Sequence, residues 1–104
     1  MANDKVLSYL GLATKAGKIQ SGEFSTEKSV KCGKAALVIV AEDASDNTKK
    51  KFKNMCSFYE VPCFVYGTKV ALGACIGKEF RASLALEDPG FCKAILKQID
   101  SEQK

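Results

Sequence analysis

Two patterns of hydrophobic and polar positions follow one another along this chain. Apolar residues spaced by about one helical turn predict amphipathic helices over residues 4–16 and 23–32, after the polar stretch 45–47 and after Pro89. A short helix is also expected over 69–75. Continuous apolar runs predict strands at 35–41, 63–66 and 83–86, the first two of them buried, and residues 18–22 are expected to be extended.

Predicted strands and helices alternate from one end of the chain to the other, without an internal repeat or a linker. This alternation is typical of an α/β domain in which helices cover both faces of a small central sheet. A chain of 104 residues is long enough for one such domain and too short for two. We therefore expect residues 1–104 to form a single domain.

Composition places the chain among ordinary globular proteins, since 46% of its residues are hydrophobic and 27% are charged. Its apolar runs are far shorter than the roughly 20 residues of a membrane span. The first residues lead into a predicted helix without a secretory apolar stretch. We therefore expect a cytoplasmic protein with no membrane partner.

Few of the residue types that carry out catalysis are present in a useful arrangement. Histidine is absent, which excludes Ser-His and Cys-His nucleophilic pairs. The five cysteines are widely spaced and lack a C-x-x-C motif, so they do not indicate a zinc site, and we interpret them as buried small hydrophobes. We expect no metal, no cofactor and no enzymatic activity, although acid–base chemistry by carboxylates or lysines stays open, as does a thiol activity if one cysteine is exposed and electropositive.

The charge pattern permits a polyanionic partner. Fifteen lysines and one arginine give a formal net charge of +4, a modest excess that does not by itself establish nucleic-acid binding. The lysine run at 49–53 surrounds Phe52 and has two interpretations: a cationic binding surface, or simply the solvated face of a helix. Its position near a helix N-terminus is slightly unfavourable for the helix dipole, which favours a use for it.

A glycine-led segment at 22–33 is the first candidate binding site. A glycine at the start of a helix allows another molecule to approach closely, and the first N–H groups of a helix are unpaired and attract phosphates. Lys28 and Lys31 lie one turn apart on the same predicted helix. The alternative is a capped, solvated helix whose lysines serve solubility.

A loop at 77–81 is the second candidate, because it places the single arginine of the chain, Arg81, beside Phe80. Arginine binds phosphates or guanine edges with two parallel hydrogen bonds, and an aromatic loop residue can stack on an unpaired base. Alternatively, Phe80 fills the core and Arg81 caps a carbonyl group.

Together, these segments resemble one known family, the L-seven-Ae ribosomal proteins, which bind kink-turn RNA. The resemblance covers residues 4–99 and is carried by 22–33, 36–45, Val61-Pro62 and 71–75, whose order and spacing are jointly specific. The stretches 11–18 and 47–51 are most similar to the bacterial YlxQ-type branch of that family.

The resemblance implies a three-layer α/β/α sandwich with a small central mixed sheet, which recognises sharply bent RNA containing sheared G·A pairs. By position, Gly22 corresponds to the glycine of close approach, Lys28 to a basic residue of the recognition helix and Lys69 to a basic residue after the second strand. The loop 78–82 corresponds to the loop that packs on an extruded base. The implied partners are structured RNA, ribosomal or otherwise containing a kink-turn, and the ribosome is a candidate.

The chain departs from the family pattern at the start of the recognition helix. Well-characterised members have asparagine and glutamate, which read the guanines, where Phe24 and Ser25 stand here, and Cys32 replaces a common arginine. Phenylalanine cannot read a base edge by hydrogen bonding, and Glu23 is the neighbouring substitute, so we expect a weaker, less specific RNA contact. The alternative function is a protein-interaction module on the same fold.

These considerations predict one RNA-binding surface. Its predicted members are Gly22, Glu23, Phe24, Ser25, Lys28, Lys31, Lys49, Lys69, Lys78, Phe80, Arg81 and Ala82. The hypothesis requires the start of the second helix and the arginine-bearing loop to lie on one positive face that is open to solvent.

Overall fold

A computed structural model describes residues 4–102. In chain order the elements are α1 (Lys5–Lys15), β1 (Ile19–Ser21), α2 (Glu23–Lys31), β2 (Leu37–Val40), α3 (Asp46–Tyr59), β3 (Cys63–Val65), α4 (Lys69–Cys75), β4 (Ser83–Leu86) and α5 (Pro89–Glu102). Side chains cap the first turns of α1 and α3. Asp4 accepts a hydrogen bond from the Leu7 backbone and Ser45 accepts one from the Thr48 backbone.

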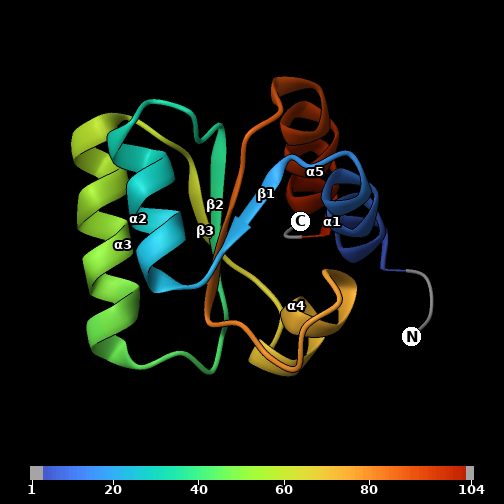
Figure 1. Cartoon of the computed structure of the whole chain (residues 1–104), viewed down its shortest axis with the longest axis horizontal. Coiled ribbons are helices and arrows are strands. Elements are labelled where there is room, and N and C mark those ends of the chain that lie inside the picture. The colour runs from blue at the N-terminus through green and yellow to red at the C-terminus, as the bar shows by residue number, and fades with distance from the viewer. Residues whose placement is uncertain (1–3, 103–104) are drawn as a thin grey trace.

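The four strands form one mixed sheet in the order β1-β4-β2-β3. β4 pairs antiparallel with both β1 and β2, whereas β3 runs parallel to β2. Helices α2 and α3 cover one face, and α1, α4 and α5 cover the other (Figure 1). The predicted three-layer α/β/α sandwich with a small mixed sheet is therefore confirmed.

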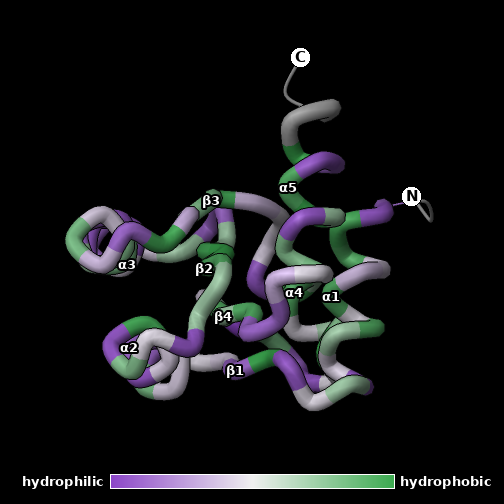
Figure 2. Tube along the Cα trace, turned by 90° about the horizontal axis from the view of Figure 1, so that it is seen from above, coloured by the Kyte–Doolittle hydropathy of each residue, from purple (hydrophilic) through white to green (hydrophobic). Residues whose placement is uncertain are grey.

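The core lies along the two central strands. Every residue of β2 and β4 is buried, as expected of strands with helices on both faces (Figure 2). Phe52 of α3 and Leu10 of α1 are fully buried from opposite layers. None of the described helices is long and apolar enough to cross a membrane.

One strand prediction needs correction, and the strand order supplies the reason. Residues 63–66 were expected to form a buried strand, but β3 is an edge strand and Val65 is 44% exposed. Its apolar run covers one side of the core without being enclosed on both faces. The prediction that residues 18–22 are extended is confirmed, since β1 lies within this stretch and pairs with β4 at the opposite edge of the sheet.

Candidate nucleic-acid interface

The start of α2 is open to solvent and lacks a side-chain cap. Gly22, the N-cap residue, has a φ of 92°, which few residues other than glycine adopt, and a Cβ atom added there would meet nothing within 4 Å. Its N–H donates to the Ser83 carbonyl at 3.0 Å, which anchors the turn to β4. The first N–H groups of α2 are therefore available to a negatively charged ligand.

A second segment, the loop 77–81, is held tightly against α4. A Cβ atom on Gly73 would lie only 2.5 Å from the Phe80 Cα atom, so only glycine allows the loop to approach this closely. The Lys78 N–H donates to the Gly73 carbonyl, and the Arg81 N–H donates to the Lys69 carbonyl. This arrangement leaves the Phe80 side chain 56% exposed, so Phe80 does not fill the core.

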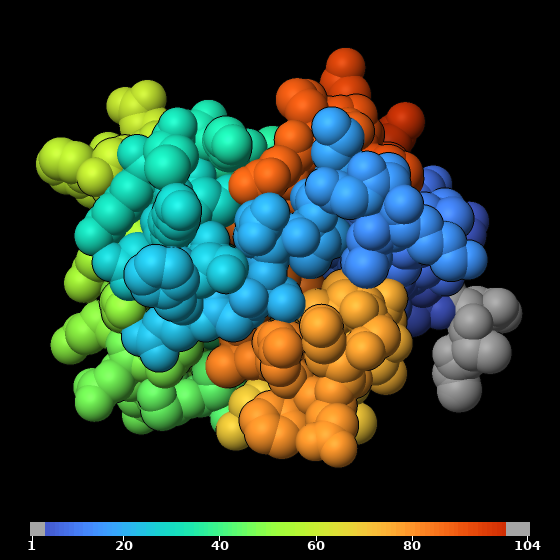
Figure 3. Space-filling view, viewed as in Figure 1, coloured from blue at the N-terminus to red at the C-terminus, as the bar shows by residue number. Residues whose placement is uncertain are grey.

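Arg81 connects the loop to the strand that precedes α2. Its Nε donates to the Ser21 hydroxyl at 3.2 Å, and its Nη1 donates to the Phe80 carbonyl at 2.8 Å. The space-filling view shows the start of α2, in blue, beside the orange loop on one face of the molecule (Figure 3). The two segments thus lie on the same solvent-open face, and Arg81 does cap a carbonyl while remaining half-exposed.

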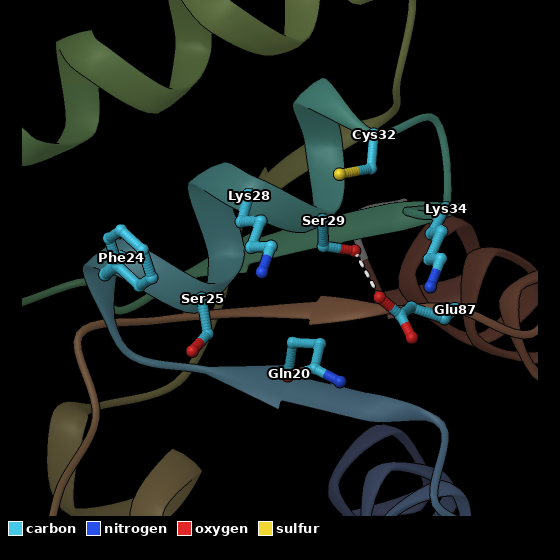
Figure 4. Close-up of a pocket in the computed structure, with 8 residues that line it drawn as sticks. All are labelled: Gln20, Phe24, Ser25, Lys28, Ser29, Cys32, Lys34 and Glu87. Carbon is cyan, nitrogen blue, oxygen red and sulfur yellow. Dashed lines mark hydrogen bonds between the residues drawn. The ribbon is translucent and has the colours of Figure 1, made fainter.

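A cleft of about 250 Å³ extends this face between α2 and β1 (Figure 4). On its floor the Ser29 hydroxyl donates to a Glu87 carboxylate oxygen at 2.6 Å. The cationic side chains of Lys28 and Lys34 border the cleft, and no ion pair neutralises either of them within residues 4–102. The residues that line the cleft are Gln20, Phe24, Ser25, Lys28, Ser29, Cys32, Lys34 and Glu87.

The other side of α2 faces α3 and is occupied by ion pairs. Lys51 of α3 lies 2.7 Å from a Glu23 carboxylate oxygen and 2.9 Å from one of Glu27, and Lys31 lies 2.7 Å from Glu27. Hydrogen bonds from these two lysines lower the pKa of Glu27 to about 2. Glu23 and Lys31 were both predicted to bind RNA. In this structure the Glu23 carboxylate pairs with Lys51 of α3, and the Lys31 ammonium pairs with Glu27 of its own helix.

Four further predicted residues have different placements. Lys78 is exposed on the loop, and Ala82 is half-buried, with its carbonyl accepting from the Ala41 N–H. Lys69 is half-buried at the start of α4, where its N–H donates to an Asp43 carboxylate oxygen. Lys49 lies on the flank of α3 that borders β3, whereas Lys51 lies on the flank that faces α2. The structure therefore does not bring Lys49 together with the α2 start.

Sequence reasoning missed several residues that shape this face. Gln20, Lys34 and Glu87 border the cleft, and Ser21 binds Arg81. They gave no signal in the sequence because the pairing of β1 with β4 brings Gln20, Ser21 and Glu87 together, and the loop after α2 brings Lys34 to them. Gly73 did offer a signal, since a glycine inside a helix costs about 1 kcal/mol relative to alanine and calls for a packing reason.

The cysteines are only partly as predicted. Cys56 and Cys92 are buried and Cys63 and Cys75 are half-buried, but Cys32 is exposed at the end of α2. Among the described residues, no three Cys, Asp or Glu side chains gather as a metal site would require.

Comparison with known proteins gives consistent matches. The model of the family described as "Ribosomal protein L7Ae/L30e/S12e/Gadd45 family" matches residues 4–97. The chain is 41% identical to the RNA-binding protein YlxQ of Bacillus subtilis (strain 168) over 91 residues, which cover 88% of this chain and 91% of the relative. It is 42% identical to RNA-binding protein YlxQ of Enterococcus faecium over 96 residues, which cover 92% of each.

Solved structures share the fold. A protein of unknown function from Bacillus halodurans C superposes with a TM-score of 0.89 at 40% identity, covering 92% of this chain and 97% of that one. The Giardia lamblia 15.5kD RNA binding protein superposes with a TM-score of 0.80 at 24% identity, covering 97% of this chain and 92% of that one, which is a likeness of fold alone.

Proposed function

Because the chain belongs to the ribosomal protein L7Ae/L30e/S12e/Gadd45 family, we propose that it binds structured RNA through the face formed by the α2 start, the cleft and the loop 77–81. We propose further that this RNA is sharply bent, as a kink-turn is. Its relatives from Bacillus subtilis and Enterococcus faecium, at 41% and 42% identity, are named as RNA-binding proteins, which supports RNA as the partner.

One observation carries the assignment to this face: the hydrogen bond from Arg81 to Ser21 joins the loop to the uncapped start of α2. A bent RNA presents two backbone segments and an unstacked base within a small region, so its binding surface needs several types of contact close together. Here helix N–H groups, unpaired lysines and an exposed phenylalanine lie on one face.

Each group has a distinct role in the proposed complex. The N–H groups that follow Gly22 bind a phosphate, and Lys28 and Lys34 neutralise phosphates along the cleft. Phe80, together with Val70, which is 65% exposed, packs on an extruded base. Lys49 is left out because it lies on a different flank of α3.

Base reading is weak in this proposal. Phe24 offers no hydrogen bond to a base edge, and Glu23, the neighbouring substitute, has its carboxylate paired with Lys51. Only the Ser25 hydroxyl remains at the helix start as a side-chain donor or acceptor. Affinity therefore depends mainly on phosphates and on RNA shape.

We propose that the protein acts without catalysis in the cytoplasm, on ribosomal or other kink-turn-containing RNA.

A protein-interaction role has one supporting observation: Phe24 is 78% exposed and, with Lys28, Lys31 and Cys32, borders an apolar hollow of about 300 Å³.

The test is a titration of the protein with a kink-turn RNA, a straight duplex and a single strand, each at several salt concentrations. We expect the kink-turn RNA to bind most tightly and Arg81→Ala to weaken it, whereas Lys93→Ala on α5 leaves it unchanged. Equal affinity for the three RNAs would exclude recognition of the bend, and absence of binding at low salt would exclude RNA. Loss of a captured protein partner in Phe24→Ala, with RNA binding intact, would favour the protein-interaction role.

A further inference from the structure

The edge of the sheet opposite β1 is formed by β3, and no strand lies beside it among residues 4–102. The Pro62 carbonyl accepts from Val38, and the Tyr66 N–H donates to Val40, so both groups point toward β2. Because backbone direction alternates along a strand that pairs on one side, the N–H and C=O groups of Cys63 and Val65 point away from the sheet. β3 therefore offers a short unpaired edge to another chain.

A hollow of about 300 Å³ lies against this edge, between β3 and α3. Its floor is apolar, made by Val40, Val65 and the thiol-bearing side chain of Cys63, and Val65 is 44% exposed. Its rim comes from α3 and is mainly cationic: Lys49, Lys50 and Lys53, with Asp46 as the single acid lining it.

The three rim lysines are not neutralised inside the protein. Lys51, from the same run, forms ion pairs with Glu23 and Glu27, but none of the rim lysines forms an ion pair in the described part of the chain. Two of them, Lys49 and Lys50, lie near the N-terminus of α3, where the helix dipole disfavours positive charge. An anionic partner would offset this repulsion.

We propose that this β3 edge docks an extended acidic segment of another protein, which adds as a fifth strand. Backbone pairing with Cys63 and Val65 supplies the main-chain contacts, and alternate side chains of the added strand face α3. An aliphatic side chain of the segment fills the hollow, and flanking aspartate or glutamate residues meet the rim lysines.

A nucleic acid fits this place less well than a peptide. The floor contains no aromatic side chain on which a base could stack. A nucleic acid backbone also lacks the alternating amide donors and carbonyl acceptors that would pair with an open strand edge.

The experiment uses the full chain and a fluorescently labelled peptide with the core Glu-Thr-Val-Thr-Glu as the probe, because the valine and both glutamates of this strand lie on one face. We expect saturable binding by anisotropy and slower amide hydrogen exchange at Cys63 and Val65. Lys49→Glu with Lys53→Glu should weaken binding by about tenfold or more, because two attractions become repulsions. Lys93→Glu with Lys97→Glu, an equal charge change on exposed positions of α5, is the matched control and should bind as wild type.

Other results would overturn the proposal. These are no binding, equal weakening by both double variants, or equal binding of the same peptide with proline at alternate positions, which would indicate charge attraction without strand pairing. Slower amide hydrogen exchange at Cys63 and Val65 on addition of single-stranded RNA would assign the edge to RNA. Slower exchange at a raised protein concentration alone would assign the edge to a second copy of the chain. Should the glutamate variant be misfolded by circular dichroism, Lys49→Gln with Lys53→Gln gives the same test with a smaller expected loss.

A pre-formed complex with kink-turn RNA separates this proposal from the RNA site. Because β1 and β3 lie at opposite edges of the sheet, we expect the peptide to bind that complex as tightly as it binds the free protein. Displacement of the peptide by the RNA would overturn the assignment to a separate edge.

Discussion

Lys28 and Lys31 lie one turn apart on α2, yet the two sides of this helix differ in charge balance. On the α3 side, Lys31 and Lys51 are neutralised by Glu23 and Glu27 at 2.7–2.9 Å. On the β1 side, Lys28 borders the cleft and has no ion pair within residues 4–102. A phosphate is attracted to cations that are not already neutralised. What distinguishes the proposed RNA face from the surface between α2 and α3 is therefore whether its lysines form ion pairs with carboxylates, and not how many lysines it has.

The largest expected effect comes from Gly73→Ala, which should disrupt the β1 side and leave the α3 side unchanged. The added methyl group would collide with the Phe80 backbone, so the loop 77–81 must move. We expect the free energy of unfolding to fall by about 1–3 kcal/mol in urea denaturation. RNA affinity should fall by about tenfold or more, because one stacked base contributes about 1–3 kcal/mol.

Ala74→Ser, at the exposed neighbouring position of α4, is the control and should change neither quantity. Wild-type RNA affinity in Gly73→Ala at a temperature where that variant is folded would show that the loop takes no part in binding.

The next largest effect should come from the double change Phe24→Asn and Ser25→Glu, which introduces the two residues that the resemblance associates with base reading at these positions. If the β1 side holds the RNA groove, these side chains reach the guanines, and one good pair of hydrogen bonds discriminates by about 1–3 kcal/mol. We expect the ratio of kink-turn to duplex affinity to rise by about tenfold. An unchanged ratio of kink-turn to duplex affinity would show that the α2 start does not face the G·A base pairs of the RNA.

A smaller contrast should separate Lys28→Ala from Lys31→Ala. Loss of Lys28 should reduce the slope of log affinity against log salt by about one, as expected for one lost phosphate contact. Loss of Lys31 should leave the slope unchanged, since Glu27 neutralises it. Equal slopes for the two variants, measured by RNA titration, would contradict the distinction between the sides.

The smallest effect concerns pH and the α3 side. The folded-state pKa of Glu27 is about 2, below the ordinary 4.5, so its ion pairs stabilise the fold above about pH 4.5 and lose this effect as pH falls toward 2. Glu27→Gln should therefore be less stable than wild type at pH 7, and the difference should shrink on acidification. Urea unfolding of both proteins between pH 7 and pH 3 measures this, and a difference that grows toward low pH would contradict it.

The elements were predictable where local pattern determines them. Leu37–Val40 is a run of β-branched and aliphatic residues that favours a buried strand, and Lys69–Cys75 begins and ends where the sequence indicated. The exposure of Val65 was not predictable, because an apolar run does not show which strand ends at the edge of the sheet. The position of a strand at the edge depends on the strand order, and in this sheet neighbouring strands are not consecutive in the chain except for β2 and β3.

The candidate site was predictable in its segments but not in its side-chain partners. Gly22 and Arg81 each stand out by residue type, and the resemblance to a family relates them. The pairing of Glu23 with Lys51 joins positions 28 residues apart, on two helices whose relative rotation no local pattern determines. Lys49 and Lys51 are two positions apart, and helical geometry directs them to different flanks.

The hydrogen bonds from Arg81 to Ser21 and from Gly22 to Ser83 lie within the protein itself, so they fix the separation of the two segments proposed to contact RNA. A preorganised surface loses little conformational entropy on docking. The rate of RNA association should therefore depend mainly on electrostatic steering and on ionic strength. Loss of the Arg81–Ser21 hydrogen bond should appear chiefly as faster dissociation of the RNA.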